Sequence, residues 1–452
     1  MYGLAKGDIR TAARGAQLFD QIVATGSLVL RRLGKTRAGE MAAHRFLSSP
    51  YVTPLGIIEA LGEGTAQRCA GRRVVAAQDT TEINFSGRSQ PPTGLGPGGN
   101  GRTAAYFIHP VVAVDVESEA VLGLVHAQIW TRAAAPVGDR HGRQIEDKES
   151  RRWIVGAEAA GEVLREATEV VVVSDREGDI YGGFARRPDS VHLVVRARHD
   201  RALEIKPGTA DETFFEAVGR QGALGAIDVQ VAPRGPGDKG RGAKVELRST
   251  RVQVKRPASG ARGEPPQLEL GLVEARELDP PPGAKPLLWR LVTTLPIASF
   301  DEAADVVRLY RLRWRIEEVF RTLKRHGLKL EDTQIEGAER LFSLTALALG
   351  AAVRIIQLVD ARDGSPRPMS DVLDQALVKP AAVIGRSCEG ATQRQKNPHP
   401  EGSLAWLAWI VARHGGWNCY YKPPGPKTMA IGWQTFAATL AGFLLATPDA
   451  NP

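Results

Sequence analysis

The sequence predicts an α/β protein in which helical segments flank a central part that contains strands. Two short apolar runs, Val74–Ala77 and Val170–Val173, have the length and the β-branched content of buried strands. Apolar residues at helical spacing recur in four other segments, at 1–70, 301–324, 341–359 and 366–452. Strand and helix patterns that alternate along one chain favour an α/β architecture.

The sequence pattern changes between residues 200 and 285, where we predict a β-rich insertion. Three alternating strands, Ala226–Val231, Lys244–Val254 and Leu268–Val273, are separated by loops rich in Pro, Gly, Lys and Arg. Trp289–Thr294 follows as one more strand. A long helix is predicted to begin near Asp301 and to run past Lys324.

Composition is that of a globular chain with an excess of positive charge. The 452 residues are 43% hydrophobic and 24% charged, which excludes disordered and collagen-like classes. The 59 Lys and Arg against 51 Asp and Glu give a net charge of +8. An excess of this sign favours a polyanionic partner, of which nucleic acid is the commonest.

The cysteines and the hydropathy of the chain indicate its cellular compartment and whether it spans a membrane. Cys69, Cys388 and Cys419 lie far apart and form no zinc pattern, so a reducing cytoplasm fits. The segment MYGLAKGDIR lacks the apolar stretch of a signal peptide. Thr428–Pro448 carries no charge, but it includes Gln434 and two glycines. We expect a buried or subunit-facing helix there rather than a membrane span.

Two aspartates follow the two apolar strands directly. Asp79 comes after Val74–Gln78, and Asp175 comes after Val170–Ser174. The carboxyl ends of neighbouring parallel strands meet at one edge of a sheet, where ligands gather. Carboxylate oxygens there suit Mg²⁺ or Mn²⁺. An aspartate at a strand end is also a common helix cap or turn former, so position alone leaves both roles open.

The predicted helix around residue 310 carries a mixed polar face. At about 100° per residue, Tyr310, Arg313, Glu317 and Lys324 fall within roughly 60° of one another. An acid on this face can hold a metal ion, and the Arg, Lys and phenol side chains can grip phosphate. The alternative is a solvated helix surface with Glu–Lys and Glu–Arg pairs.

Four segments together resemble the insertion-sequence-four family of bacterial DDE transposases, the family of the kanamycin-resistance composite transposon. The third-acid signature Tyr-x2-Arg-x3-Glu-x6-Lys is matched by Tyr310, Arg313, Glu317 and Lys324. Gln78-Asp79-Thr80-Thr81 is similar to the first-acid motif, and 174–180, Ser-Asp-Arg-Glu-Gly-Asp-Ile, to the second. Trp289 stands where a relative has a Trp that stacks on a base flipped out of DNA.

Weaker likeness extends to 43–54, 109–130 and 148–153, whereas the N-terminal residues before Gly7 are few and 366–452 match poorly. The resemblance implies a ribonuclease-H-like catalytic core at 71–365, interrupted by the β-rich insertion at 200–285. It implies a helical DNA-binding domain at 1–70 and a helical C-terminal domain at 366–452 that dimerises.

The chemistry implied by the resemblance is cut-and-paste transposition of double-stranded DNA by a cytoplasmic homodimer in a synaptic complex. Asp79, Asp175 and Glu317 would hold two Mg²⁺ or Mn²⁺ ions for hydrolysis, hairpin formation and strand transfer. Tyr310, Arg313 and Lys324 would hold phosphates, and Trp289 would stack on the displaced base. Arg196, on the strand Val194–Arg198, is a further candidate DNA contact.

Two other functions fit the same residues. A metal-dependent nuclease with this core would cut DNA without joining it. An inactive DNA-binding relic or an inhibitor of transposition would bind without cutting, although the presence of all three acids and the complete signature argues against decay.

Overall fold

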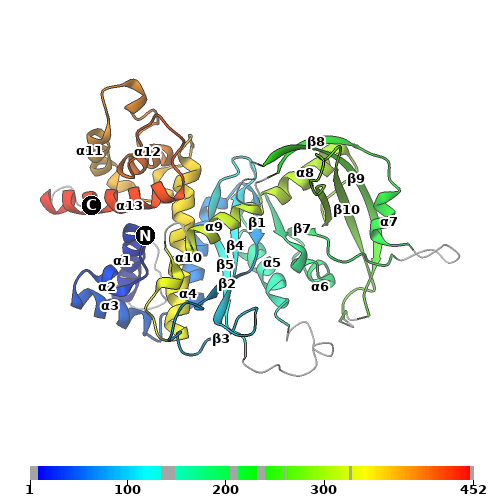
Figure 1. The fold of residues 1–452 in the computed structure, drawn as a ribbon, viewed down its shortest axis with the longest axis horizontal. Coiled ribbons are helices and arrows are strands. Elements are labelled where there is room, and N and C mark those ends of the chain that lie inside the picture. The colour runs from blue at the N-terminus through cyan, green and yellow to red at the C-terminus, as the bar shows by residue number, and fades with distance from the viewer. Residues whose placement is uncertain are drawn as a thin grey trace. The chain divides into compact units, whose positions relative to one another are not determined.

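The computed structural model describes residues 9–133, 148–203, 212–231, 240–258, 260–261, 263–324 and 328–447. The chain divides into two compact units. Unit 1 comprises Met1–Ala70, Thr80–Pro136 and Arg315–Pro452, and unit 2 comprises Gly71–Asp79 and Val137–Trp314. Figure 1 shows their helices and strands. The mixed α/β architecture predicted from the sequence is confirmed.

Unit 2 is built on a sheet with a parallel and an antiparallel part. Its strand order is β1-β6-β7-β11-β10-β9-β8. The pairs β1–β6 and β6–β7 are parallel, and the four remaining pairs are antiparallel. The strand bounds are β1 Arg73–Gln78, β6 Glu169–Ser174, β7 Val191–Arg196, β8 Gly225–Val231, β9 Arg241–Lys255, β10 Gln267–Glu277 and β11 Leu288–Thr293. The segment predicted as a β-rich insertion therefore extends the same sheet through β8, β9 and β10.

The parallel part of the sheet is apolar throughout. Val170–Val173 of β6 and Val74–Ala77 of β1 are buried, as expected for strands covered on both faces. Helix α5 (Arg151–Val163) packs on β1, β6 and β7, and α8 (Phe300–Arg311) packs on β6, β7 and the antiparallel strands β9 to β11. The Arg73 side chain fixes α8 to β1 through bonds of 3.0 and 2.7 Å to Asp305.

Two shorter helices complete the described part of unit 2. The first, α6, spans Tyr181–Ala185, and the second, α7, spans Phe214–Gly219 and packs on β9 and β10. Both α7 and α8 begin at capping boxes, Thr213 with Glu216 and Ser299 with Glu302. Each box satisfies two backbone N–H groups at a helix start, which fixes where the helix begins.

Unit 1 is centred on the long helix α10 (Ala338–Ala361), which is buried along most of its length. It packs on α1, α4, α12, α13 and strand β5. The helices are α1 Ile9–Thr25, α2 Leu30–Gly34, α3 Arg37–Leu47, α4 Pro54–Cys69, α9 Trp314–Lys324, α11 Val378–Cys388, α12 Leu404–His414 and α13 Pro426–Ala446. The predicted helical character of the N- and C-terminal segments is confirmed over these ranges; Gly7 and Asp8 lie outside the described residues.

Unit 1 contains four described strands, and β4 pairs antiparallel with the other three. The four are β2 Thr81–Asn84, β3 Gly96–Pro97, β4 Ala104–Asp115 and β5 Val121–Trp130. Strands β4 and β5 thus form an antiparallel hairpin. Helix α4 packs against β5, so the apolar face of the N-terminal segment is buried inside this unit.

Two helices, α10 and α13, are long and apolar enough to cross a membrane. The apolar window of α10 is 89% buried, which identifies it as a core helix. The window of α13 is 33% buried. Two helices that pass a test of length and composition are weak grounds for a membrane protein, because core helices pass the same test.

The sequence predicts one helix from Asp301 past Lys324, and this prediction is wrong. Helix α8 ends at Arg311, and α9 begins at Trp314. Between them the backbone tightens to i→i−3 bonds, with the N–H of Leu312 on Leu309 and the N–H of Arg313 on Tyr310. Tyr310, Arg313, Glu317 and Lys324 therefore do not form one face of a continuous helix.

Candidate active site and nucleic-acid interface

The two predicted aspartates follow neighbouring parallel strands of unit 2 in register. In the β1–β6 pair, Ala77 lies opposite Val173, so Gln78 and Ser174 follow as the last residues of their strands. Asp79 and Asp175 come next. Strands in a sheet lie about 4.7–4.9 Å apart, which brings two carboxylate-bearing positions to the same edge. The adjacency predicted from the sequence is thus present in the fold.

Asp175 begins a tight turn whose shape depends on a glycine. Its Oδ1 accepts the N–H of Glu177 at 2.9 Å and so caps the short 3₁₀ turn Arg176–Gly178. A Cβ on Gly178 would lie 2.3 Å from the Ser174 hydroxyl, so this turn requires glycine. The capping role and a metal-binding role are compatible, because a carboxylate has several lone pairs.

Asp79 forms a half-buried ion pair with Arg313. Arg313 Nη1 lies 2.6 Å from Asp79 Oδ2, and the two side chains are 8% and 15% exposed. Arg313 lies in the turn between α8 and α9. In the structure its guanidinium contacts a carboxylate, and its predicted role in holding phosphate stays a prediction.

The two aromatic residues predicted to contact DNA, Trp289 and Tyr310, are buried against each other. Their ring centroids are 5.8 Å apart in an edge-to-face arrangement. Trp289 is 8% exposed and Tyr310 is 2% exposed, so this pair forms part of the packing between β11 and α8. Sequence reasoning missed Trp314, which is 50% exposed and has the Arg313 guanidinium 4.9 Å from its ring centroid. Its position between two arginines is a signal that could have identified it.

Glu317 and Lys324 lie in unit 1 on helix α9. Both are half-buried, and the helix packs through Ile316, Val319, Phe320 and Leu323. The adjacent Glu318 lies in a charged cluster with Arg315 and Asp360, where Arg315 Nη1 is 2.6 Å from Glu318 Oε2. Arg315 also pairs with Asp360. Burial raises the pKa of Glu318 and of Asp360 above their usual range, and Arg315 opposes both shifts.

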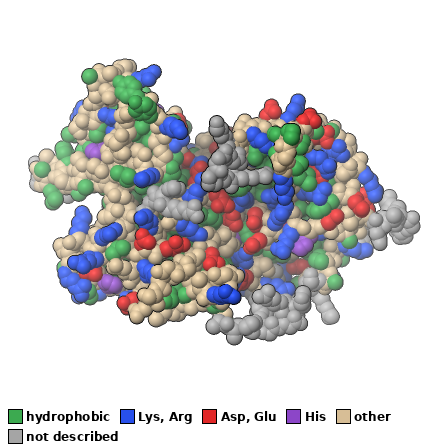
Figure 2. Space-filling model, in the orientation of Figure 1, with side chains coloured by type: hydrophobic (Ala, Val, Ile, Leu, Met, Phe, Trp, Pro, Cys, Tyr) green, Lys and Arg blue, Asp and Glu red, His purple; other side chains and the backbone are tan. Residues whose placement is uncertain are grey.

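Arg196 lines a cavity of about 490 Å³ in unit 2, here named the arginine pocket. The lining residues are Arg176, Arg196, Ala197, Arg198, Phe215, Leu288 and Arg290. Figure 2 shows several Lys and Arg side chains on the visible face over this part of unit 2. Arg196 was predicted as a DNA contact, whereas Arg176, Arg198, Arg290 and Phe215 were not singled out. The strand β11 carries Trp289 and Arg290 in sequence, and alternation turns them to opposite faces of the sheet.

Within the described part of the chain, no group of three or more His, Cys, Asp or Glu side chains is gathered as a metal site. The chemistry of the two strand-end carboxylates nevertheless fits a hard divalent cation. Asp175 Oδ1 is used by its own turn, and its second oxygen makes no hydrogen bond to the described residues. Asp79 and Asp175 thus supply oxygen donors of the right kind from a rigid edge.

Residues 157–354 match the family model of the transposase DDE domain. The matched range contains Asp175, Trp289, Arg313 and Glu317 and begins after Asp79. The match supports a DDE transposase, an enzyme class that cuts and moves DNA. Enzymes of this class act on DNA and generally use divalent metal ions.

Proposed function

We propose that this protein is a cut-and-paste DNA transposase of the insertion-sequence-four type, with Asp79, Asp175 and Glu317 as its catalytic acids. The observation that carries the proposal is the register of β1 and β6, which places Asp79 and Asp175 after neighbouring parallel strands. The match of the surrounding residues to a transposase DDE domain supports it. A ribonuclease-H-like core is the corresponding fold proposal.

The three acids would hold two Mg²⁺ or Mn²⁺ ions. When bound, such ions lower the pKa of an attacking hydroxyl and stabilise charge on the leaving 3′ oxygen at phosphorus. The protein's own contribution is to hold the carboxylates on rigid elements. Asp79 is oriented by Arg313 and Asp175 by the Glu177 N–H. Without these contacts, each carboxylate would sample several rotamers.

Arg313 holds the Asp79 carboxylate in one orientation through the ion pair of 2.6 Å. Lys324 and Tyr310 remain proposed as residues that act on phosphates near the cut. Tyr310 and Trp289 are buried against each other, so a base or phosphate reaches them only when neighbouring side chains move. The exposed Trp314 offers a stacking surface that needs no such movement.

The reaction sequence proposed is hydrolysis at a transposon end, hairpin closure and strand transfer into target DNA. The first cut uses water as the nucleophile, and hairpin closure uses the 3′-hydroxyl that this cut releases. A second water opens the hairpin and regenerates the 3′-hydroxyl, which then attacks the target DNA. Double-stranded DNA carrying inverted repeats would be the substrate, bound by a homodimer in a synaptic complex. The helices of residues 1–70 would bind DNA, and those of 366–452 would dimerise.

The test is incubation of the full chain and Mg²⁺ with DNA carrying the inverted repeats that flank its gene, together with a target plasmid. A transposase yields cleaved ends and then joined products. Asp79→Ala should bind the ends and cut none of them. Cleavage without joining would favour the nuclease alternative. Cleavage by Asp79→Ala would contradict the assignment of Asp79 as a catalytic acid.

A further inference from the structure

We propose that the arginine pocket binds a single-stranded segment of DNA and seats one nucleotide with its phosphates. This inference rests on the proposed function, because it takes DNA as the substrate, and it adds where an unpaired strand is held. The pocket lies entirely within unit 2 and is lined by four arginines and Phe215.

Three of the four pocket arginines have no carboxylate partner among the residues that the structure describes. Arg176, Arg196 and Arg198 make no ion pair with any described residue. Other arginines of the same unit are paired, Arg73 with Asp305 and Arg201 with Asp179. Guanidinium groups that converge without carboxylate partners form a site for anions, and phosphate is the anion whose geometry they match.

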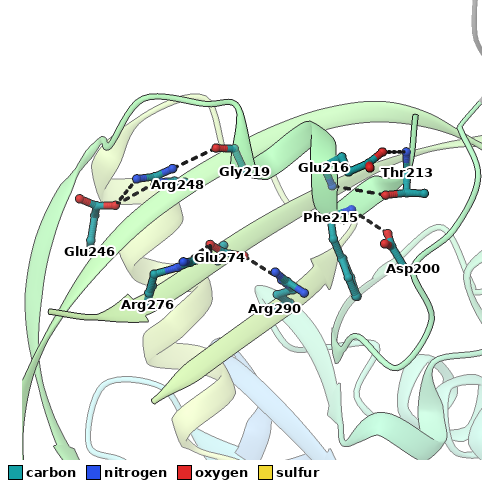
Figure 3. A network of polar contacts seen from close by, with 10 residues as sticks. All are labelled: Asp200, Thr213, Phe215, Glu216, Gly219, Glu246, Arg248, Glu274, Arg276 and Arg290. Atoms are coloured by element: carbon teal, nitrogen blue, oxygen red, sulfur yellow. Dashed lines mark hydrogen bonds and ion pairs between the residues drawn. The ribbon is translucent and has the colours of Figure 1, made fainter. Parts of the chain in front are cut away.

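The fourth arginine is held in place and stacked on the aromatic ring. Arg290 Nε lies 2.7 Å from Glu274 Oε2, and Glu274 also binds Arg276 at 2.9 Å (Figure 3). The Arg290 guanidinium lies 4.1 Å from the Phe215 ring centroid. The backbone N–H of Phe215 is fixed in turn by Asp200 at 2.8 Å. Ring and guanidinium thus form a stack that a base can extend.

The size of the cavity and its platform favour an unpaired strand over a duplex. Its volume of about 490 Å³ falls within the range of about 300–1,000 Å³ typical of small-molecule sites. Bases inside a duplex are stacked on each other and expose only their edges, so they cannot reach a platform inside a pocket. An unpaired nucleotide offers both a ring face and phosphates.

The pocket is tied to the loop of the second aspartate. Arg176 follows Asp175 directly, and the buried carboxylate of Asp179, three residues further on, accepts the N–H groups of Arg198 and His199 at 2.7 and 3.0 Å. The end of β7 that carries the pocket arginines is therefore held against the turn that carries Asp175. A strand held here lies next to a proposed catalytic acid.

Binding of a fluorescein-labelled oligothymidylate of about eight nucleotides to the full chain, without added metal, tests the proposal. Phe215→Leu keeps apolar bulk and removes the ring, so it should weaken binding about fivefold or more. Arg198→Ala, an exposed position, should weaken binding and lower the salt slope by about one. Arg276→Ala is the matched control, because it removes one charge and one Glu274 partner outside the pocket.

The expected result is weakened binding in the two pocket variants and unchanged binding in Arg276→Ala. The proposal is overturned if the pocket variants bind like Arg276→Ala. It is also overturned if a duplex of equal length competes as well as the single strand, or if inorganic pyrophosphate displaces the oligonucleotide with equal affinity. These outcomes are independent of cleavage, so the pocket can fail while the catalytic acids stand, and the reverse.

Discussion

The two halves of the sheet in unit 2 differ in strand direction and in what they contribute to the polar groups of the unit. The parallel half, β1-β6-β7, ends in two carboxylates, of which Asp79 is paired with Arg313. It also supplies Arg176 after β6 and Arg196 and Arg198 at the end of β7, and these three arginines have no ion-pair partner among the described residues. The antiparallel half, β11-β10-β9-β8, adds Arg290 and Leu288 to the same pocket, and its Arg290 is paired with Glu274.

Arginines can serve two functions here, the orientation of a carboxylate and the binding of phosphate. A metal-holding carboxylate needs a fixed orientation, which a paired arginine supplies. A phosphate needs a guanidinium that has not already been neutralised. We therefore distinguish Arg313, which orients Asp79, from the pocket arginines, which we propose bind phosphate. The experiments below test this distinction.

The largest effect is expected at the acid edge. Asp175→Asn keeps the cap on the Glu177 N–H and loses the negative charge, so cleavage of bound transposon ends should fall by about a thousandfold or more. Glu177→Gln is the neighbouring control, because Glu177 pairs with Arg152 at 2.6 Å and carries no proposed metal. Single-turnover cleavage at saturating DNA measures both. Equal losses in the two variants would count against a special role for Asp175.

The next effect distinguishes an orienting arginine from a phosphate-binding one. Arg313→Ala removes the guanidinium that pairs with the largely buried Asp79 carboxylate, so the free energy of unfolding should fall by about 3 kcal/mol. The salt slope of DNA binding should not change. Urea denaturation and binding at several salt concentrations give both quantities. A slope reduced by about one, with stability unchanged, would restore the sequence prediction that Arg313 holds phosphate.

The sequence predicted the strand-end aspartates well because that inference needs only two apolar runs and the rule for parallel neighbours. It did not predict the break after Arg311 or the ion pair of Arg313 with Asp79, because these two residues are distant in the chain. The pocket was missed for a similar reason. Arg176, Phe215 and Arg290 are far apart in sequence, and only the pairing of β7 with β11 and the packing of α7 unite them. The packing of Trp289 against Tyr310 also depends on tertiary structure, because it joins β11 to α8.

A smaller effect is expected at Asp179, whose side chain is fully buried and bonded to Arg201. Asp179→Asn should lower the free energy of unfolding by about 2 kcal/mol and also weaken oligothymidylate binding, because the end of β7 loosens. Glu277→Gln is a matched control, since Glu277 is buried and holds Arg241 and the Leu287 N–H. It should cost similar stability and leave binding unchanged. Similar binding losses in both variants would show a general effect of instability.

The smallest effect concerns pH and unit 1. Burial raises the pKa of Glu318 in the folded state, so the folded state binds its proton more tightly than the unfolded state does. This contribution to stability is present below the unfolded pKa of about 4.3 and is lost as pH rises through the folded pKa. Glu318→Gln should therefore make the free energy of unfolding less dependent on pH above about 4. An unchanged pH profile would contradict this origin.

The location of the metal is tested most directly by iron-directed cleavage of the protein backbone. Fe²⁺ replaces Mg²⁺ in the full chain, and ascorbate with peroxide generates hydroxyl radicals that cut the chain near the bound ion. We expect cuts near Asp79, Asp175 and Glu317, suppressed by excess Mg²⁺ and lost in Asp175→Asn. Cuts confined to other segments, or an identical pattern in Asp175→Asn, would contradict the assignment of these acids as the metal site.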